Sequence, residues 1–288
     1  MAKEKDGEAV FLTGAPAETL GFITALFLTH FPERDVTFLA EAFGQIQKAF
    51  AGSYPGYQAC DTGFHNLSHT CQVATAAVCI LDGYCKSGRL PILTFRDYEL
   101  TVAGILLHDI GYLKEVGDNR GTGAKHTFSH VDRGVDFTAR FLPPLGATPD
   151  EIRQVQLSIR STAVNVDMSK LPFRDPRERF MGCVFGTADL LGQMAAPDYP
   201  ERLPKLFREF SEAASYSTAA KGAMASSQSP EDLLRRTREF YNGYARRMLD
   251  HEWDGVYHLV EYHFPDRRNL YVEAIDANLD RIDRLLEN

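Results

Sequence analysis

The stretch FHNLSHTCQVATAAVCILDGY, residues 64–84, places a long apolar run directly behind two histidines. We expect one helix over this stretch, with Asp61 or Thr62 as its N-cap, because both side chains can accept a hydrogen bond from a first-turn N–H. On such a helix His65 and His69 stand at positions i and i+4 and can address one point in space. The pair alone is weak evidence for a metal site, so its meaning depends on the rest of the chain.

Helix signals dominate the remaining sequence, and strand signals are scarce. Apolar residues at spacings of three and four predict helices over residues 16–28 and 35–51. Further helices are expected over residues 95–110, closed by Gly111, and over residues 128–141. Thr148, Asp175 and Ser229 are each followed by a proline and an acidic residue, which predicts three more helix starts. The last two helices should run to about Met194 and towards His251. The expected fold class is all-α.

Three parts of the chain are expected to form one globular unit. Residues 1–50 should be an N-terminal helical extension packed on the core, residues 51–215 the catalytic core, and residues 216–288 a C-terminal helical extension. KGAMASSQSP, residues 221–230, is the stretch most typical of a linker.

Composition argues against several classes of protein. The net charge is −8, and the arginine-rich stretches 174–179 and 235–238 are interrupted or short, so no nucleic-acid polymer is expected as a partner. No apolar run reaches the roughly 18 residues that span a bilayer, and the start MAKEKDGEAVF lacks the form of a signal peptide. The five cysteines form no CxxC pair, which predicts reduced thiols in a cytoplasmic protein without membrane association.

Polar residues interrupt two other apolar segments. His108 and Asp109 stand together in GILLHDIGY, and Asp189 falls inside the predicted helix that contains TADLL. Burying such groups without a partner costs several kcal/mol. A bound metal would account for them, and so would a satisfied core histidine or an internal salt bridge with an arginine.

A second histidine pair follows a glycine-rich loop. His126 and His130, in HTFSH, again stand at i and i+4, at the start of the predicted helix 128–141. The four remaining histidines occur in polar or aromatic contexts and predict no site; they are His30, His251, His258 and His263.

In chain order, His69, His108-Asp109 and Asp189 resemble the H…HD…D pattern of the HD-domain metal-dependent phosphohydrolase superfamily. The wider motifs FHNLSHT, GILLHDIGY and TADLL are more similar to the branch shared with cyclic-nucleotide phosphodiesterases. The resemblance covers roughly residues 55–210. It implies an HD-domain helical bundle, here with helical extensions at both ends.

The resemblance also implies roles for individual residues. His65 would be the general acid, and Asp109 would orient the attacking hydroxide. A first divalent ion would be held by His69, His108, Asp109 and Asp189. The ion would be Mn, Fe, Mg or Zn, since imidazole and carboxylate ligands suit all four.

A second ion is also compatible with the family pattern. His130, followed four residues later by Gly134, matches a histidine that serves a second metal in some members, and His126 is a weaker candidate. Two departures weigh against full cyclic-nucleotide specificity. The next helix, EIRQVQLSIRSTAV, contains no histidine, and Tyr112 stands where the phosphodiesterases have one.

The leading hypothesis is a phosphohydrolase that acts on a phosphomonoester or phosphodiester of a nucleotide or other small molecule. Lys125, Arg133 and Arg160 are candidate phosphate-binding residues, because an anion needs fixed donors, although each is more readily explained as a surface charge. Two alternatives stay open: an HD-type di-iron oxygenase, which needs a complete second metal site, and a non-catalytic HD-like regulatory module. The sequence leaves a homodimer open.

Overall fold

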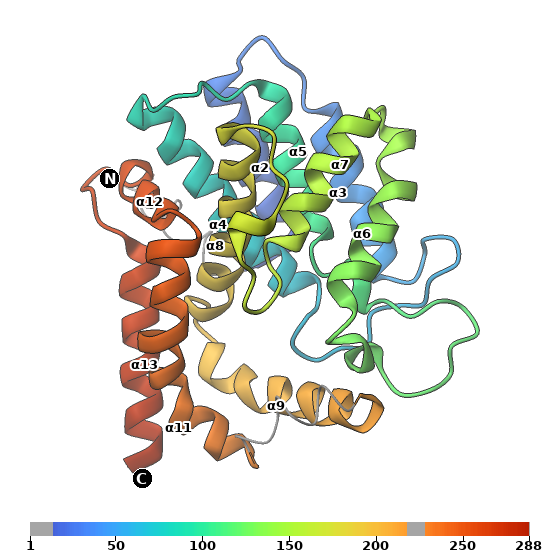
Figure 1. The fold of residues 1–288 in the computed structure, drawn as a ribbon, viewed down its shortest axis with the longest axis vertical. Helices are drawn as coiled ribbons and strands as arrows, with labels where there is room; N and C mark the ends of the chain where they lie inside the picture. The colour runs from blue at the N-terminus through green and yellow to red at the C-terminus, as the bar shows by residue number, and fades with distance from the viewer. Residues whose placement is uncertain (1–13, 218–227, 288) are drawn as a thin grey trace.

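The computed structural model describes residues 14–217 and 228–287 and confirms an all-α fold for this part of the chain (Figure 1). The described residues form no β-structure apart from one isolated bridge between Tyr57 and Glu115. The α-helices are α2 (Pro16–His30), α3 (Thr37–Phe50), α4 (Leu67–Ser87), α5 (Phe95–Leu107), α6 (His130–Phe141), α7 (Pro149–Arg160), α8 (Pro176–Met194), α9 (Tyr199–Tyr216), α11 (Pro230–Phe240), α12 (Val260–His263) and α13 (Leu270–Glu287).

Short turns of other helix types join these elements. The 3₁₀ turns are η1 (Ile110–Tyr112), η2 (Gly123–His126), η3 (Pro143–Leu145), η4 (Met168–Lys170) and η7 (Val256–Leu259). Two turns of π-helix, η5 (Tyr241–Ala245) and η6 (Met248–Glu252), continue the chain after α11.

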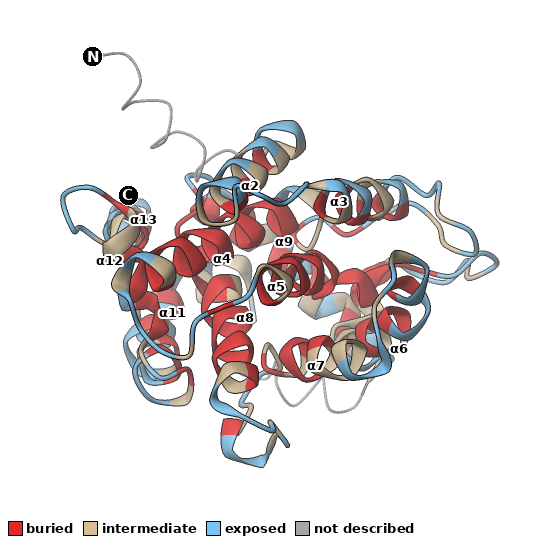
Figure 2. Ribbon diagram, turned by 90° about the horizontal axis from the view of Figure 1, so that it is seen from above, coloured by how far each residue is buried: buried red, intermediate tan, exposed pale blue. Residues whose placement is uncertain are grey.

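Helix α4 is the centre of the molecule. Every residue from His69 to Tyr84 is buried, and the helix packs against α2, α5, α8 and α12. Figure 2 shows α4 and α8 as buried along most of their length. A helix that is enclosed on all sides needs apolar or small residues on every face, and the run that follows His69 supplies them.

Helices α4 and α8 approach each other very closely. A Cβ atom on Gly192 of α8 would lie only 2.7 Å from the Cα of Val73 on α4, so a residue without a side chain is required at this crossing. The contact brings the first turns of α4 against the last turns of α8. It thereby places His69 and Asp189 near each other.

The three predicted helix starts are confirmed. Thr148 caps α7 in a capping box with Glu151, Asp175 caps α8, and Ser229 caps α11. These signals depend on hydrogen bonds between residues a few positions apart, so the local sequence is sufficient to predict them.

The predicted start of the central helix is wrong. Helix α4 begins at Leu67 rather than at residue 64, because the side chain of Asn66 accepts a hydrogen bond from the N–H of His69 and caps the helix there. The expected caps bond elsewhere: Asp61 accepts from a backbone N–H in the loop before α6, and Thr62 donates to a backbone carbonyl of its own loop.

The two histidine pairs therefore do not share helices as expected. His65 precedes α4, although its ring centroid is still 5.7 Å from that of His69. His126 ends the 3₁₀ turn η2, and His130 is the first residue of α6, which begins two residues later than predicted. Each pair is thus split between a loop or turn and a helix.

The helix predicted over residues 95–110 also ends early. Helix α5 stops at Leu107 with His108 as its C-cap, and Asp109 leaves the helical region (φ −103°, ψ 5°) before η1 begins. In a continuous α-helix two adjacent side chains diverge by about 100°. The break between α5 and η1 lets His108 and Asp109 reach the same place.

The C-terminal part departs most from the prediction. Helix α11 ends at Phe240, and the chain continues as π turns where an α-helix towards His251 is predicted. Both predicted extensions contact the core, since α2 and α12 pack on α4; the predicted boundaries themselves stay predictions. Two sequence predictions lie outside the described residues. They concern the first residues, 1–11, which lack the form of a signal peptide, and residues 221–227, which make up most of the predicted linker.

Two expectations from composition can be compared with the structure. None of the described helices combines the length and the apolar character that crossing a membrane requires. All five cysteines are free thiols, and three of them are buried.

Candidate metal centre

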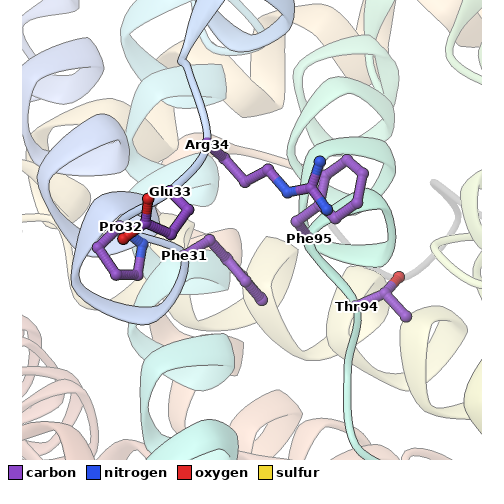
Figure 3. A pocket seen from close by; sticks show the side chains of 6 residues that line it. All are labelled: Phe31, Pro32, Glu33, Arg34, Thr94 and Phe95. Carbon is purple, nitrogen blue, oxygen red and sulfur yellow. The ribbon is translucent and has the colours of Figure 1, made fainter.

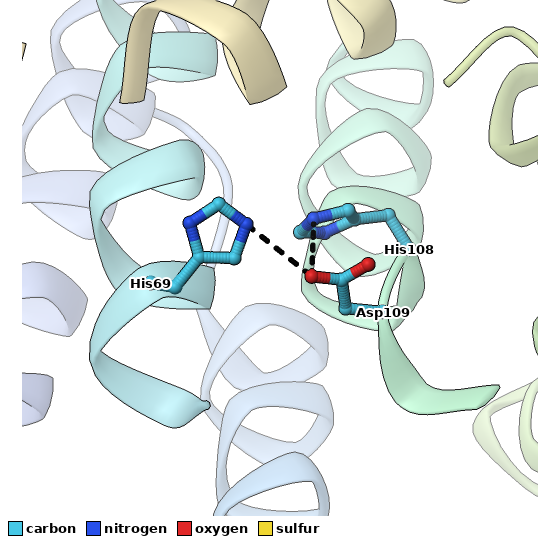
Figure 4. Close-up of side chains that lie close together, drawn as sticks. All are labelled: His69, His108 and Asp109. Carbon is cyan, nitrogen blue, oxygen red and sulfur yellow. Dashed lines mark ion pairs between the residues drawn. The ribbon is translucent and has the colours of Figure 1, made fainter. Parts of the chain in front are cut away.

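Three buried side chains converge where α4, the end of α5 and the start of η1 meet (Figure 4). Asp109 Oδ2 lies 3.2 Å from His69 Nε2 and 3.3 Å from His108 Nε2. The three residues are at most 3% exposed. Their candidate ligand atoms all lie within 4.8 Å of one another, as the donors around one metal ion do.

The atoms that face this centre have no hydrogen-bond partners. His69 Nε2, His108 Nε2 and Asp109 Oδ2 are buried and make no hydrogen bond, although they stand at ion-pair distance from one another; a buried polar atom without a hydrogen bond is costly. Ligands bound at about 2.1 Å in tetrahedral or octahedral geometry lie roughly 3.0–3.4 Å apart. The observed separations of 3.2 and 3.3 Å match this spacing. The residues therefore fit a divalent metal ion.

Asp189 brings a second carboxylate to the centre from α8. Its Oδ1 lies 3.4 Å from His69 Nε2 and 3.6 Å from His108 Nε2. The Asp189 side chain is 25% exposed, whereas the two histidine side chains are 1% exposed. The structure thus brings together all four residues expected to hold the first ion, and the side of Asp189 is the accessible one.

The charges of the centre attract each other strongly. His108 Nδ1 donates a hydrogen bond to the Ile105 carbonyl at 2.7 Å, so Nε2 is the ring atom that faces the centre. Burial opposes charge on every group, but the neighbouring carboxylates outweigh it and raise the pKa of His108 well above its usual value. The imidazoles likewise outweigh burial and lower the pKa of Asp109 and of Asp189. Both carboxylates are therefore ionised at neutral pH.

His65 lies beside the centre and is held by an acid from α9. Its Nδ1 donates to Glu209 Oε2 at 2.5 Å, and the N–H of Phe64 donates to Glu209 Oε1 at 2.6 Å. Burial favours the neutral ring, but the charges of Asp109 and Glu209 overcome it and raise the pKa of His65. No local pattern in the sequence marks Glu209, which is 144 residues away from its partner.

Tyr112 stacks between two histidines. Its ring centroid is 4.4 Å from that of His65 and 4.6 Å from that of His130, with the planes 10° and 19° apart. Residues three apart eclipse each other in a 3₁₀ turn, so Tyr112 lies on the same side of η1 as Asp109. The tyrosine found at this position thus separates the two histidine rings.

His130 faces the second oxygen of Asp109. Its Nδ1 donates to the Thr127 carbonyl at 2.7 Å, and its Nε2 lies 3.7 Å from Asp109 Oδ1. Burial lowers the pKa of His130, so the neutral ring keeps a lone pair on Nε2. The two oxygens of Asp109 therefore face histidines on opposite sides, and a role of His130 at a second ion stays a prediction.

His126 and Lys125 are paired with an aspartate of the loop before α6. Lys125 Nζ lies 2.5 Å from Asp118 Oδ1, and His126 Nε2 lies 3.8 Å from Asp118 Oδ2. Burial, with the charges of Arg133 and Lys125, lowers the pKa of His126 to about 4. Both residues thus pair with Asp118 rather than with a carboxylate of the candidate metal centre.

The two other predicted phosphate-binding residues also have protein partners. Arg133 donates to the carbonyls of Gly111 and Leu113, each at 2.7 Å, and so braces the turn that follows Asp109. Arg160 pairs with Asp132 at 2.6 Å on the exposed surface. A substrate would have to compete with these contacts or use the remaining donors of each side chain.

A surface pocket of about 470 Å³ lies elsewhere, between the end of α2 and the start of α5 (Figure 3). It is lined by Phe31, Pro32, Glu33, Arg34, Thr94 and Phe95. None of these residues is buried, and the Arg34 guanidinium already stacks 3.8 Å above the Phe95 ring. The pocket thus lacks the desolvated polar groups that mark a reactive site.

Comparison with known proteins identifies no family: no family model matches the sequence, and no curated protein matches it significantly. A function can therefore be inferred only from the sequence motifs and from the geometry of the candidate site.

Proposed function

We propose that this protein is a metal-dependent phosphohydrolase of the HD-domain type, which cleaves a phosphomonoester or phosphodiester of a nucleotide or another small molecule. One observation supports it most: His69 Nε2, His108 Nε2 and Asp109 Oδ2 are buried, make no hydrogen bond and are spaced as ligands of one ion. Polar atoms gathered from distant parts of a chain in this way are costly unless a cation joins them.

The four residues at the centre have complementary parts in this proposal. A divalent ion bound by His69, His108, Asp109 and Asp189 would neutralise charge on a phosphoryl oxygen and lower the pKa of bound water. Asp109 Oδ1, which is turned away from the two histidines, would accept a hydrogen bond from the attacking water. The partly exposed side at Asp189 is where a substrate can approach.

His65 is the proposed general acid. Glu209 accepts from Nδ1, so the protonated ring carries its transferable proton on Nε2. The charges of Asp109 and Glu209 raise the pKa of His65, which favours the protonated ring near neutral pH. This proton would pass to the leaving oxygen of the ester.

Metal analysis combined with a hydrolysis screen tests the proposal. The protein, loaded in turn with Mn, Fe, Mg and Zn, is assayed on nitrophenyl phosphate mono- and diesters and on nucleotides. We expect hydrolysis with at least one ion. A folded, metal-loaded protein that hydrolyses none of them contradicts the proposal. Two bound irons without hydrolysis would indicate the di-iron oxygenase, and no bound metal would indicate the regulatory module.

The His65→Ala variant tests the proton donor separately. It should keep its metal and lose about 10²–10⁴-fold in kcat, the usual contribution of a general acid. His258→Ala is the matched control, because His258 is an exposed histidine paired with Glu261, and it should change neither quantity. Loss of metal from His65→Ala would show that His65 is a ligand instead.

A further inference from the structure

Helix α9 carries a buried arginine that the proposed chemistry does not use. Arg202 is 4% exposed. Its Nη1 donates to Gln72 Oε1 at 2.7 Å and its Nη2 to the Phe64 carbonyl at 2.8 Å. The guanidinium also lies 4.7 Å above the Phe64 ring. Burying a charged side chain is costly unless its hydrogen bonds are made. The hydrogen bonds of Arg202 therefore fix both the side chain and the groups that accept them.

Both backbone polar groups of Phe64 are held by side chains of α9. The N–H of Phe64 donates to Glu209, and its carbonyl accepts from Arg202. The fully buried Phe64 ring lies 4.9 Å from the His65 ring and 5.7 Å from the His69 ring, measured between centroids. Phe64 is therefore fixed by α9 on one side and packs against the site histidines on the other.

His65 needs such support because it does not lie on a helix. Helix α4 begins only at Leu67, where Asn66 caps it, so His69 is positioned by the first turn of the helix itself. His65 belongs to the preceding segment, which is held by single local bonds: the Phe64 carbonyl accepts from the N–H of Asn66 at 3.0 Å, and the His65 carbonyl accepts from Thr62 Oγ1. Contacts from α9 add to these bonds.

We propose that Arg202 is a positioning residue: by holding the Phe64 carbonyl, it keeps the segment before α4 in the conformation that presents His65 to the metal centre. The inference rests on the proposed function, since it concerns the presentation of the general acid. Because the metal ligands are fixed by α4, α5, η1 and α8, Arg202 acts on His65 and leaves metal binding unchanged.

Arg202→Met tests this by removing both hydrogen bonds while keeping a side chain of similar length. We expect kcat to fall about 10–100-fold, as small displacements of catalytic groups do, and metal affinity to stay within about twofold of the wild type. Residues that act as a unit are non-additive. Adding Arg202→Met to His65→Ala should therefore cause no further loss, whereas an additional, multiplicative loss would overturn the proposal.

A spectroscopic measurement makes the test independent of activity. The short His65–Glu209 hydrogen bond predicts a downfield proton resonance for His65 Nδ1–H, assigned by its loss in His65→Ala. This resonance should broaden or disappear in Arg202→Met. If it persists unchanged there, Arg202 does not position His65, even if the wild type hydrolyses no phosphoester.

Two further variants complete the experiment. Arg179→Met removes an arginine that pairs with Asp254 through two 2.8 Å hydrogen bonds away from α9, and it should keep both the resonance and kcat. Arg202→Lys keeps the charge and one donor and should recover part of kcat. If Arg202→Met does not fold, the same measurements of kcat and of the His65 resonance are made on Arg202→Lys, for which a smaller loss of kcat is expected.

Discussion

Two buried aspartates, Asp109 and Asp82, each lie between two histidines, yet only one of the two clusters resembles a metal site. Asp82 of α4 contacts His30 Nε2 at 2.8 Å and His263 Nδ1 at 2.6 Å, and Lys86 Nζ at 2.7 Å completes the cluster. At Asp109 the corresponding imidazole distances are 3.2 and 3.3 Å. The residue types are nearly the same, and the separations differ by about half an ångström.

This difference decides what each cluster can do. Around Asp82 the donors and acceptors are at hydrogen-bond distance, so the charges satisfy each other without an ion. Around Asp109 the two ring nitrogens lie 3.2 and 3.3 Å from the carboxylate oxygen, at ion-pair distance, but none of the three atoms makes a hydrogen bond. A cation fits between groups that converge without touching.

The Asp82 cluster has a structural role of its own. His30 is the last residue of α2, and His263 is the last residue of α12. Their common partner on α4 therefore links the N-terminal and C-terminal helical parts to the central helix. The contrast makes Asp109 a candidate metal ligand and Asp82 a structural link between helices, and mutations can separate the two.

The largest expected effect is the loss of metal from His69→Ala. Removing even an outer partner of a metal ligand costs 10–100-fold in affinity, so loss of a ligand should cost more than about 100-fold. Metal content after desalting measures it. His263→Ala, the equivalent change in the other cluster, should keep the metal. If both variants lost metal equally, the cluster at Asp109 and the cluster at Asp82 would not differ in metal binding.

The next largest effect is on stability, in Asp82→Asn. Removing one partner of a buried ion pair costs about 3–5 kcal/mol, and Asp82 is completely buried beneath three basic side chains. Urea unfolding should show this decrease, while the folded variant still binds metal. The control is Asp132→Asn, whose exposed partner is Arg160; it should cost less than about 1 kcal/mol.

The smallest expected effect concerns pH. Burial opposes protonation of His263, but Cys79 and Asp82 raise its pKa from 6.5 to about 10. Because the folded value is the higher one, this stabilisation is complete below pH 6.5 and is lost as the pH rises towards 10. The wild type should lose about 1.5–3 kcal/mol between pH 7 and 10, the value of a hydrogen bond to a charged group.

His263→Gln isolates that contribution, since a neutral amide cannot titrate in this range. Unfolding free energies at pH 7 and pH 10 should differ less in the variant than in the wild type. A pH dependence of equal size in both proteins would mean that His263 does not carry the charge assigned to it.

The candidate site was partly predictable because some of its signals are local. His108, Asp109 and Asp189 attract attention as polar residues within apolar segments, and the structure brings them together with His69. Glu209 does not attract attention, because an acid on an amphipathic surface helix is ordinary until its partner is known. Asp82 also interrupts an apolar segment, but its histidine partners lie 52 and 181 residues away, so the local sequence does not reveal that they satisfy it.

Helix ends were less predictable than helices. The Asn66 cap competes with two equally suitable caps earlier in the loop, and tertiary hydrogen bonds engage both of those instead. The early end of α5 likewise gives no sequence signal, since His108 and Asp109 are compatible with a continuing helix. These small shifts matter, because they move His65 off α4 and turn His108 and Asp109 towards one point.

The amino-acid sequence by itself determined the all-α class, the three capped helix starts and the polar residues that interrupt apolar segments. Each of these depends on periodicity, on hydrogen bonds within one helical turn, or on the cost of burying a polar group in an apolar segment. Only the tertiary structure decided which histidines pair with a carboxylate and which leave room for an ion. That choice depends on how the side chains are spaced and oriented, which the crossing of α4 with α8 and the break after α5 set.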